Sequence, residues 1–370
     1  MSTSTSAVPP TPLRFAPSME KPEENEAETN AGLIEQFDKI SQTTFAHSGH
    51  ATRSVHAKSH GVLCGELTVL DRLPPELAQG LFAKAGRYAV AMRFSTLPGD
   101  ILDDSVSTPR GLAVKVIGVE GARLPGSEGD VTQDFVMVNG PAFSAPTAAK
   151  FLGNLKMLAA TTDKAEGLKK AVSAVARGTE SLIEAFGGKS PTITTMGGQP
   201  ETHILGETFY SQVPILYGDY IAKFSVAPIF DLSLLTGAPI DANNRPNALR
   251  DAVSDHFTAK GGEWEFRIQL CTDLDTMPIE DASVVWPEDA SPYVPVARLQ
   301  VEPQPSWDPT AVAAIDEGLA FSPWHGLAAH RPLGSVMRAR NTTYTNSAEF
   351  RGKHNGCPMH EPKAIADLKG

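Results

Sequence analysis

The chain has 370 residues, of which 41% are hydrophobic and 20% charged, as in an ordinary soluble globular protein. The formal net charge of −11 argues against nucleic acid and anionic membrane surfaces as partners. No apolar run approaches the roughly 20 residues of a transmembrane helix, and the three cysteines are too widely spaced for a disulfide framework or a thiolate zinc site. We therefore expect a cytoplasmic protein without a membrane span, in which the cysteines are reduced.

The N-terminal third predicts an arm, a helix and a series of strands. Residues 1–29 are rich in Ser, Thr, Pro and Glu, and we expect them to form a disordered arm. The spacing of Leu33, Ile34 and Phe37 predicts a short amphipathic helix over residues 30–39. A second short helix is expected at the prolines after Leu73. Strands are predicted over residues 61–70, 88–95, 111–118 and 134–138.

The character of the sequence changes after Pro146. Residues 148–186 are rich in Ala, Leu, Lys and Glu and predict two or three helices. Strands return over residues 220–226, 264–271 and 293–301, and residues 333–351 are again helical. The early strands follow one another without a long helix between them, which favours an antiparallel sheet or barrel over βαβ units. The expected organisation is one α+β domain over residues 30–356, with a tail over residues 357–370.

Two short segments far apart in the sequence carry side chains suited to a buried site. Arg53 stands three residues before His56, so a cation could hold an anionic ligand beside an imidazole. In the expected C-terminal helix, Tyr344 has Arg340 at i−4 and Arg351 at i+7, on one stripe. A guanidinium and a ferric ion both favour a phenolate, so this stripe could supply an anionic oxygen ligand to haem iron. Solvated arginines and a packing tyrosine stay open as the alternative.

A zinc site is a second interpretation of the histidines. His56 and His60 are four residues apart, and His50 lies close before them. However, Gly61 and Gly65 break the helix that such a pair needs, and no HExxH motif is present. Most histidines are surface or core residues without a ligand.

Five short motifs occur in the same order as in the haem-containing monofunctional catalases. They are His56-Ala-Lys, Arg93-Phe-Ser-Thr96, Pro109-Arg-Gly-Leu-Ala-Val-Lys115, Val285-Trp-Pro287 with Pro295-Val-Ala-Arg-Leu299, and Arg340-x3-Tyr344. Each motif alone is weak, but five in order are specific. The chain resembles this family from about Gln36 to Arg351, and in particular its small, truncated catalase-related peroxidases. The resemblance implies a catalase-like fold, an antiparallel β-barrel core with surrounding helices and no long C-terminal extension, and haem b with its iron as the cofactor.

The resemblance also implies roles on the distal side of such a haem. His56 matches the distal histidine, which moves a proton from one peroxide oxygen to the other. Ser95 matches the serine that hydrogen-bonds this histidine. Phe143 and Phe151 are expected to form apolar walls, and Val55 precedes the histidine within the pocket.

On the proximal side, the resemblance assigns the metal ligand and the residues that hold the cofactor. Tyr344 matches the tyrosinate that binds the iron, and Arg340 the arginine that keeps it ionised. The arginines that bind the haem propionates, where a guanidinium fork suits a carboxylate, correspond to Arg53, Arg93 and Arg351.

The sequence departs from the family in two places near the expected pocket. The distal asparagine of the family sits in an Asn-Asn-x-Pro segment, and the run here is Met137-Val-Asn139-Gly-Pro141. An ungapped match puts Val138 at the functional position, and we nominate Asn139, one place later. Ser59 replaces the usual glycine, and His60 is expected to add an imidazole near the pocket rim.

Three functions agree with these features. The first is a haem peroxidase with some catalase activity, in which peroxide oxidises the haem and a second peroxide or an organic electron donor reduces it. The second is a hydroperoxide-rearranging enzyme of the allene oxide synthase type, but those enzymes carry threonine where Val55 stands here, which favours the first. The third is a haem-binding protein with incidental peroxide reactivity. The expected partners are a small-molecule peroxide and an organic donor, and we expect a homo-oligomer, either a dimer or a tetramer.

Overall fold

The computed structural model describes residues 11–162, 199–356 and 359–368. The strands of this part are β1 (Ser59–Val69), β2 (Gly86–Thr96), β3 (Arg110–Ile117), β4 (Thr132–Val138), β5 (Phe209–Tyr210), β6 (Ile215–Tyr217), β7 (Tyr220–Ile229), β8 (Gly262–Leu270) and β9 (Val294–Val301). They pair antiparallel in the order β5-β4-β3-β2-β1-β9-β8-β7-β6. A further pairing of β5 with β7 closes the sheet into an eight-stranded barrel that leaves β6 on its edge.

The barrel interior is filled by every second side chain of the strands. Val90, Met92 and Phe94 of β2 belong to the main apolar core, together with residues of β3, β4, β7, β8 and β9. Burial of each large apolar side chain contributes about 1.5–3 kcal/mol. The alternate residues of β2, β3 and β4 point outward, and this outer face is where the helices approach.

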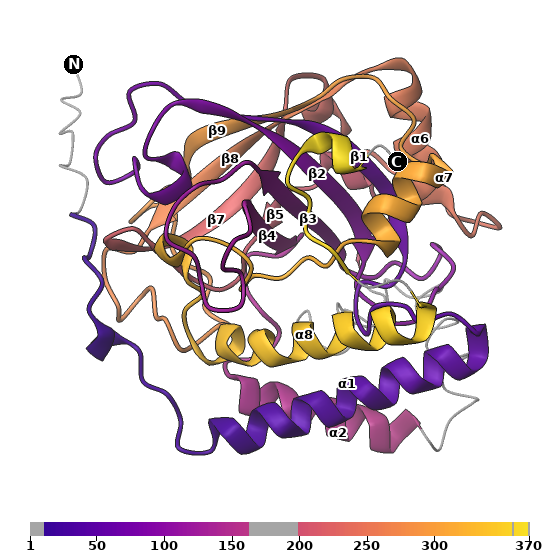
Figure 1. Ribbon diagram of the computed structural model, residues 1–370, viewed down its shortest axis with the longest axis horizontal. Coiled ribbons are helices and arrows are strands. Elements are labelled where there is room, and N and C mark those ends of the chain that lie inside the picture. The colour runs from indigo at the N-terminus through magenta and orange to yellow at the C-terminus, as the bar shows by residue number, and fades with distance from the viewer. Residues whose placement is uncertain (1–10, 163–198, 357–358, 369–370) are drawn as a thin grey trace, which may run out of the picture.

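Three helices cover this face of the barrel. Figure 1 shows α8 (Ser335–Asn355) against the barrel and α1 (Glu26–Ser48) beneath it, beside α2 (Ala148–Thr162). Leu33, Ala148, Leu152 and Ala339 join the three helices in one apolar cluster. Elsewhere α6 (Ala248–Ala259) packs on β1, and the short α7 (Pro309–Ala311) runs into a π-helical turn over Val312–Glu317. None of the described helices is long and apolar enough to cross a bilayer.

The expected strands are all present, and the remaining elements differ from expectation in places. The sequence did not predict β5 and β6, which have only two and three residues. It did contain a signal for α6, because Leu249, Val253 and Phe257 recur every four residues and are buried. The segment after Leu73 forms turns and a 3-10 helix over Gly80–Phe82 instead of an α-helix. Of the helices expected over residues 148–186, α2 is observed and the remainder lies outside the described residues.

The end of the expected arm is structured in the part that the structure describes. Leu13 N donates to Cys271 O (2.8 Å), and Phe15 N donates to Asp219 O (2.8 Å). Leu13, Phe15 and Met19 pack on an apolar cluster that includes Trp286. The helix expected at residues 30–39 begins at Glu26 and continues to Ser48. Residues 13–19 therefore lie against the barrel, because their apolar side chains cover an apolar cluster there.

One arginine joins this N-terminal segment to the start of α8. Arg338 donates to Glu20 Oε1 (2.8 Å), to Glu26 Oε1 (2.5 Å) and to Glu280 Oε2 (3.0 Å). Glu280, from the connection between β8 and β9, also accepts from Ser335 N (2.9 Å), at the first turn of α8. The side chains of this network are 10–24% exposed. Charge-assisted bonds among partly buried groups fix the position of the helix.

Replacing the arginine tests this role. Arg338→Met keeps the length of the side chain but leaves three carboxylates close together, so we expect the free energy of unfolding to fall by about 3 kcal/mol. Urea unfolding measures this change. The matched control is Arg14→Met, because the Arg14–Asp219 pair is 71% and 61% exposed and contributes little. Equal losses in the two variants would show that the network does not anchor α8.

Candidate active site on the outer face of the barrel

A cavity of about 500 Å³ lies between the outer face of β2–β4 and the helices. α1, α2 and α8 each contribute residues to its walls. All the site residues expected from the sequence line it: Arg53, Val55, His56, Arg93, Ser95, Asn139, Phe143, Phe151, Arg340, Tyr344 and Arg351. The fold thus brings the two distant segments to one place.

The floor of the cavity is hollow because the middle strand carries small residues. The register places Ser95 of β2, Gly111 of β3 and Val138 of β4 in one row, and a second row runs parallel to it through Ala113. A Cβ atom on Gly111 would lie 2.6 Å from the His56 ring and 3.0 Å from Ser95 Oγ. Gly111 was part of a motif in the sequence, but only the register reveals that it makes room for the imidazole.

His56 is held in place by a hydrogen bond of its backbone and by a contact of its ring with Ser95. Its φ of 55° is unusual for a residue other than glycine, and its N–H donates to Leu97 O (2.7 Å). Nδ1 lies 3.1 Å from Ser95 Oγ. Burial, followed by the positive charges of Arg93 and Arg340, lowers the pKa of His56 from 6.5 to about 3. The imidazole is therefore neutral near pH 7 and can accept a proton.

Three guanidiniums lie close together at the cavity, and two of them bind the buried carboxylate of Asp316. Asp316 Oδ1 accepts from Arg53 Nη1 (2.7 Å) and from Arg93 Nε (2.6 Å). Arg53 and Arg351 both donate to Leu319 O (3.1 Å each). Burial, followed by the charges of Arg351 and Arg93, lowers the pKa of Arg53 well below its ordinary value. A cluster of guanidiniums suits a ligand with acidic groups.

Asp316 was not recognised in the sequence. Burial opposes its ionisation, but the charges of Arg93 and Arg53 hold its pKa below the ordinary value. It lies in the π-helical turn, an element that is frequent at functional sites. No motif marks this turn, so a carboxylate at this position could be found only from the structure.

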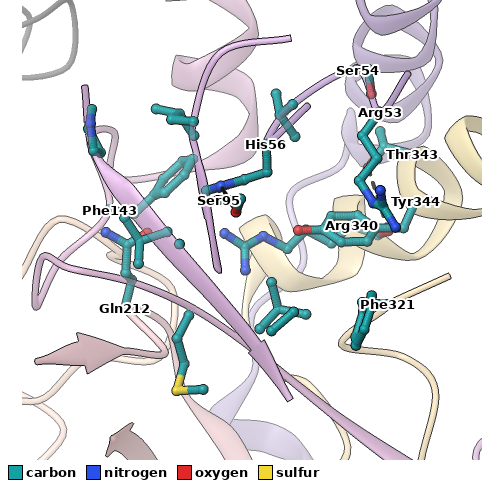
Figure 2. A pocket seen from close by; sticks show the side chains of 18 of the residues that line it. Arg53, Ser54, His56, Ser95, Phe143, Gln212, Phe321, Arg340, Thr343 and Tyr344 are labelled. Atoms are coloured by element: carbon teal, nitrogen blue, oxygen red, sulfur yellow. Dashed lines mark hydrogen bonds between the residues drawn. The ribbon is translucent and has the colours of Figure 1, made fainter. Parts of the chain in front are cut away.

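Tyr344 and Arg340 enter the cavity from α8, as the spacing predicted. Figure 2 shows both side chains extending from the helix toward the side that carries His56 and Ser95. Arg340 Cζ lies 5.8 Å from the centre of the Phe143 ring. Tyr344 from α8 and the neutral imidazole of His56 therefore line the same cavity.

The side walls are apolar. The Phe143 and Phe151 rings lie 5.0 Å apart at 60°, an edge-to-face contact. Leu33 and Phe37 of α1 also line the cavity. The sequence assigned these two residues to helix packing, and nothing in their spacing distinguishes a pocket wall from a core contact.

Two residues occupy positions other than those expected. His60 is wholly buried away from the cavity rim, with Nε2 3.1 Å from Thr96 Oγ1. Asn139 borders the cavity, but its Oδ1 accepts from Arg110 N (2.9 Å) and its Nδ2 donates to Glu207 Oε2 (3.4 Å). His60 lies in β1 and Asn139 directly follows β4, where one residue of register decides which face a side chain takes.

The histidines do not converge on a metal site. His50 is exposed and lies 3.0 Å from Glu317, His60 is buried beside Thr96, and His56 faces the cavity. Among the residues with described positions, no cluster of three or more His, Cys, Asp or Glu side chains could hold a metal ion. The zinc interpretation has no support from this geometry.

Comparisons with known proteins identify the fold. No family model and no curated protein matches the chain. Among solved structures it is similar to a fungal catalase (TM-score 0.58, 18% identity, 89% of this chain and 65% of that one) and to catalase A from Saccharomyces cerevisiae (0.58, 19%, 89% and 67%). It is also similar to a bacterial catalase, with a TM-score of 0.55 and 17% identity over 95% of this chain and 66% of that one. The chain spans about two thirds of the length of these structures. Such low identity establishes the fold alone, and the predicted catalase-like α+β barrel is confirmed.

Adding one methyl group to the cavity floor tests the contact with His56. Gly111→Ala should push the imidazole out of its place, lower the free energy of unfolding by about 1–3 kcal/mol, and raise the pKa of His56 toward its ordinary value as the ring becomes solvated. NMR titration of the histidine ring signals measures the pKa. Gly153→Ala is the control, because a Cβ there meets no neighbour and alanine favours a helix. An unmoved His56 titration in Gly111→Ala would contradict the contact.

Proposed function

We propose that this chain is a haem-dependent enzyme that consumes peroxides, of the catalase-related peroxidase type. The observation that carries the proposal is the combination of His56, Ser95, Tyr344 and the arginine cluster in one cavity. A neutral imidazole at one side and a phenol at the other are the groups that the resemblance assigns to opposite faces of a haem. The catalase-like fold supports this reading.

The residues present fit haem b. Arg53 and Arg93 share the buried carboxylate of Asp316, and Arg351 lies beside them, so this cluster of guanidiniums could bind the two propionates. Gly111 and Ala113 leave the floor of the cavity open. Tyr344 would provide the oxygen ligand to the iron, and Arg340, one turn earlier on α8, projects into the same cavity. Bound haem would supply the redox-active iron at which a peroxide O–O bond is broken.

His56 would transfer the proton of the peroxide, and its neighbours hold it in position. The neutral His56 accepts the proton of the peroxide oxygen nearest to it and returns it to the departing oxygen as the bond breaks. Ser95 Oγ, 3.1 Å from Nδ1, fixes the orientation of the ring. Val55, next to His56, offers no hydroxyl that could temper its reactivity, which favours peroxide reduction over rearrangement.

A three-way assay on haem-loaded protein tests the function. Wild type should oxidise a phenolic donor with hydrogen peroxide or an organic peroxide, and His56→Ala should lower this rate about 10²–10⁴-fold, the usual contribution of general acid–base catalysis. Tyr344→Phe should change the ferric haem spectrum, because the phenolate is lost. His50→Ala, at an exposed histidine, is the control and should leave both properties unchanged.

The three arms use peroxide alone, peroxide with a donor, and a fatty-acid hydroperoxide without a donor. Conversion in the third arm only would identify a rearranging enzyme. Stable haem uptake without turnover in any arm would identify a haem-binding protein. Either result, or a spectrum in Tyr344→Phe identical to that of wild type, would overturn the proposal.

A further inference from the structure

The cross-strand register places a valine beside the catalytic imidazole. Gly111 pairs with Ser95 on one side and with Val138 on the other. Directly opposed residues of antiparallel strands project from the same face of a sheet. The direction of the missing Cβ on Gly111 leads to the His56 ring, 2.6 Å away. The Val138 side chain therefore leaves the sheet on the same face as His56, and it lines the cavity.

Asn139, the first residue after β4, borders the cavity, but its carboxamide is engaged as both acceptor and donor, with Arg110 N and Glu207 Oε2. Glu207 also accepts from Thr202 Oγ1 (2.6 Å), and the Arg110 side chain donates to Pro200 O (2.7 Å). The amide of Asn139 thus belongs to a polar cluster whose other members do not line the cavity.

Two neutral hydrogen-bonding groups of this part of the cavity are also engaged with the protein. Ser95 is occupied with the imidazole. Gln212 borders the cavity, but its Nε2 donates to Ala142 O (2.6 Å). Val138 stands with the apolar lining residues Val55, Leu97, Phe143 and Phe151.

We infer that Val138 is a specificity-determining residue that makes organic hydroperoxides better oxidants for this site than hydrogen peroxide. This inference rests on the proposed function. Hydrogen peroxide carries a hydroxyl at each end, and the end beside Val138 loses its hydrogen-bond partner on leaving water. An alkyl or aryl group at that end instead contacts the isopropyl group and the aromatic walls. The reaction is ROOH + AH₂ → ROH + H₂O + A, in which the hydroperoxide is reduced and the organic donor AH₂ is oxidised.

Installing an amide at residue 138 tests the inference. With a phenolic donor, we compare kcat/KM for cumene hydroperoxide with kcat/KM for hydrogen peroxide. Wild type should prefer cumene hydroperoxide, and Val138→Asn should lower this preference about tenfold or more, within the 10–200-fold range of such pocket changes. Val138→Ala, which stays apolar, should retain the preference. Asn139→Ala should also retain it, although the variant loses two hydrogen bonds.

A measurement on the protein without haem tests which side chain lies beside His56, independently of activity. NMR of the apo protein should show that Val138→Asn shifts the His56 ring signals and that Asn139→Ala does not. If Asn139→Ala changes the peroxide preference or the His56 signals while Val138→Asn changes neither, Asn139 is the residue beside the imidazole and the inference is wrong. If wild type turns over neither peroxide, the proposed function fails first. Turnover of both peroxides with the same preference in wild type and Val138→Asn overturns this inference alone.

Discussion

The approach of His56 to Gly111 is the contact on which the site depends. The imidazole lies so close to β3 that no side chain fits between them. The same absence of a side chain opens the floor on which a flat ligand can lie. Ser95 and Val138 flank this contact because the strand register is continuous across β2, β3 and β4. The position of the imidazole is thus fixed by a barrel whose interior is closely packed and does not deform easily.

The charges of the site are arranged around a second constraint. Three arginines lie close together, two of them bind the buried Asp316, and like charges held near one another repel. An acidic ligand would relieve this repulsion. Burial, followed by the charges of Arg93, Arg340 and Arg53, keeps His56 uncharged. Arg53 and Arg93 thus act both in the arginine cluster and on the imidazole.

Much of the fold and most of the site were predictable from the sequence. Apolar and β-branched runs located the long strands, one of them strictly alternating, and five ordered motifs located His56 and Tyr344. The structure brings all the nominated residues to one cavity. The short strands β5 and β6 were not predictable, because two or three residues carry no periodicity.

The finer errors have a common physical cause. The Asn139 amide borders the cavity but bonds to Arg110 N and Glu207, and His60 is buried beside Thr96 instead of lying at the cavity rim. A shift of one residue in a strand reverses the direction of every side chain, and a single sequence does not fix such a register. Asp316 was missed for another reason, because its role arises from two arginines that are more than 200 residues away in the chain.

The anchoring of α8 has a consequence for how the molecule is assembled. Arg338 binds Glu20 across 318 residues of sequence, so this anchor of the helix that carries Tyr344 forms only when the two distant segments meet. Contacts of such long range form late, because the loop that they close is costly in entropy. During synthesis the segment that carries Glu20 emerges long before Arg338, so the contact between them cannot form until most of the chain has been made. The cavity is therefore completed near the end of folding, and a chain that is still being made has the floor of the site but not its far wall.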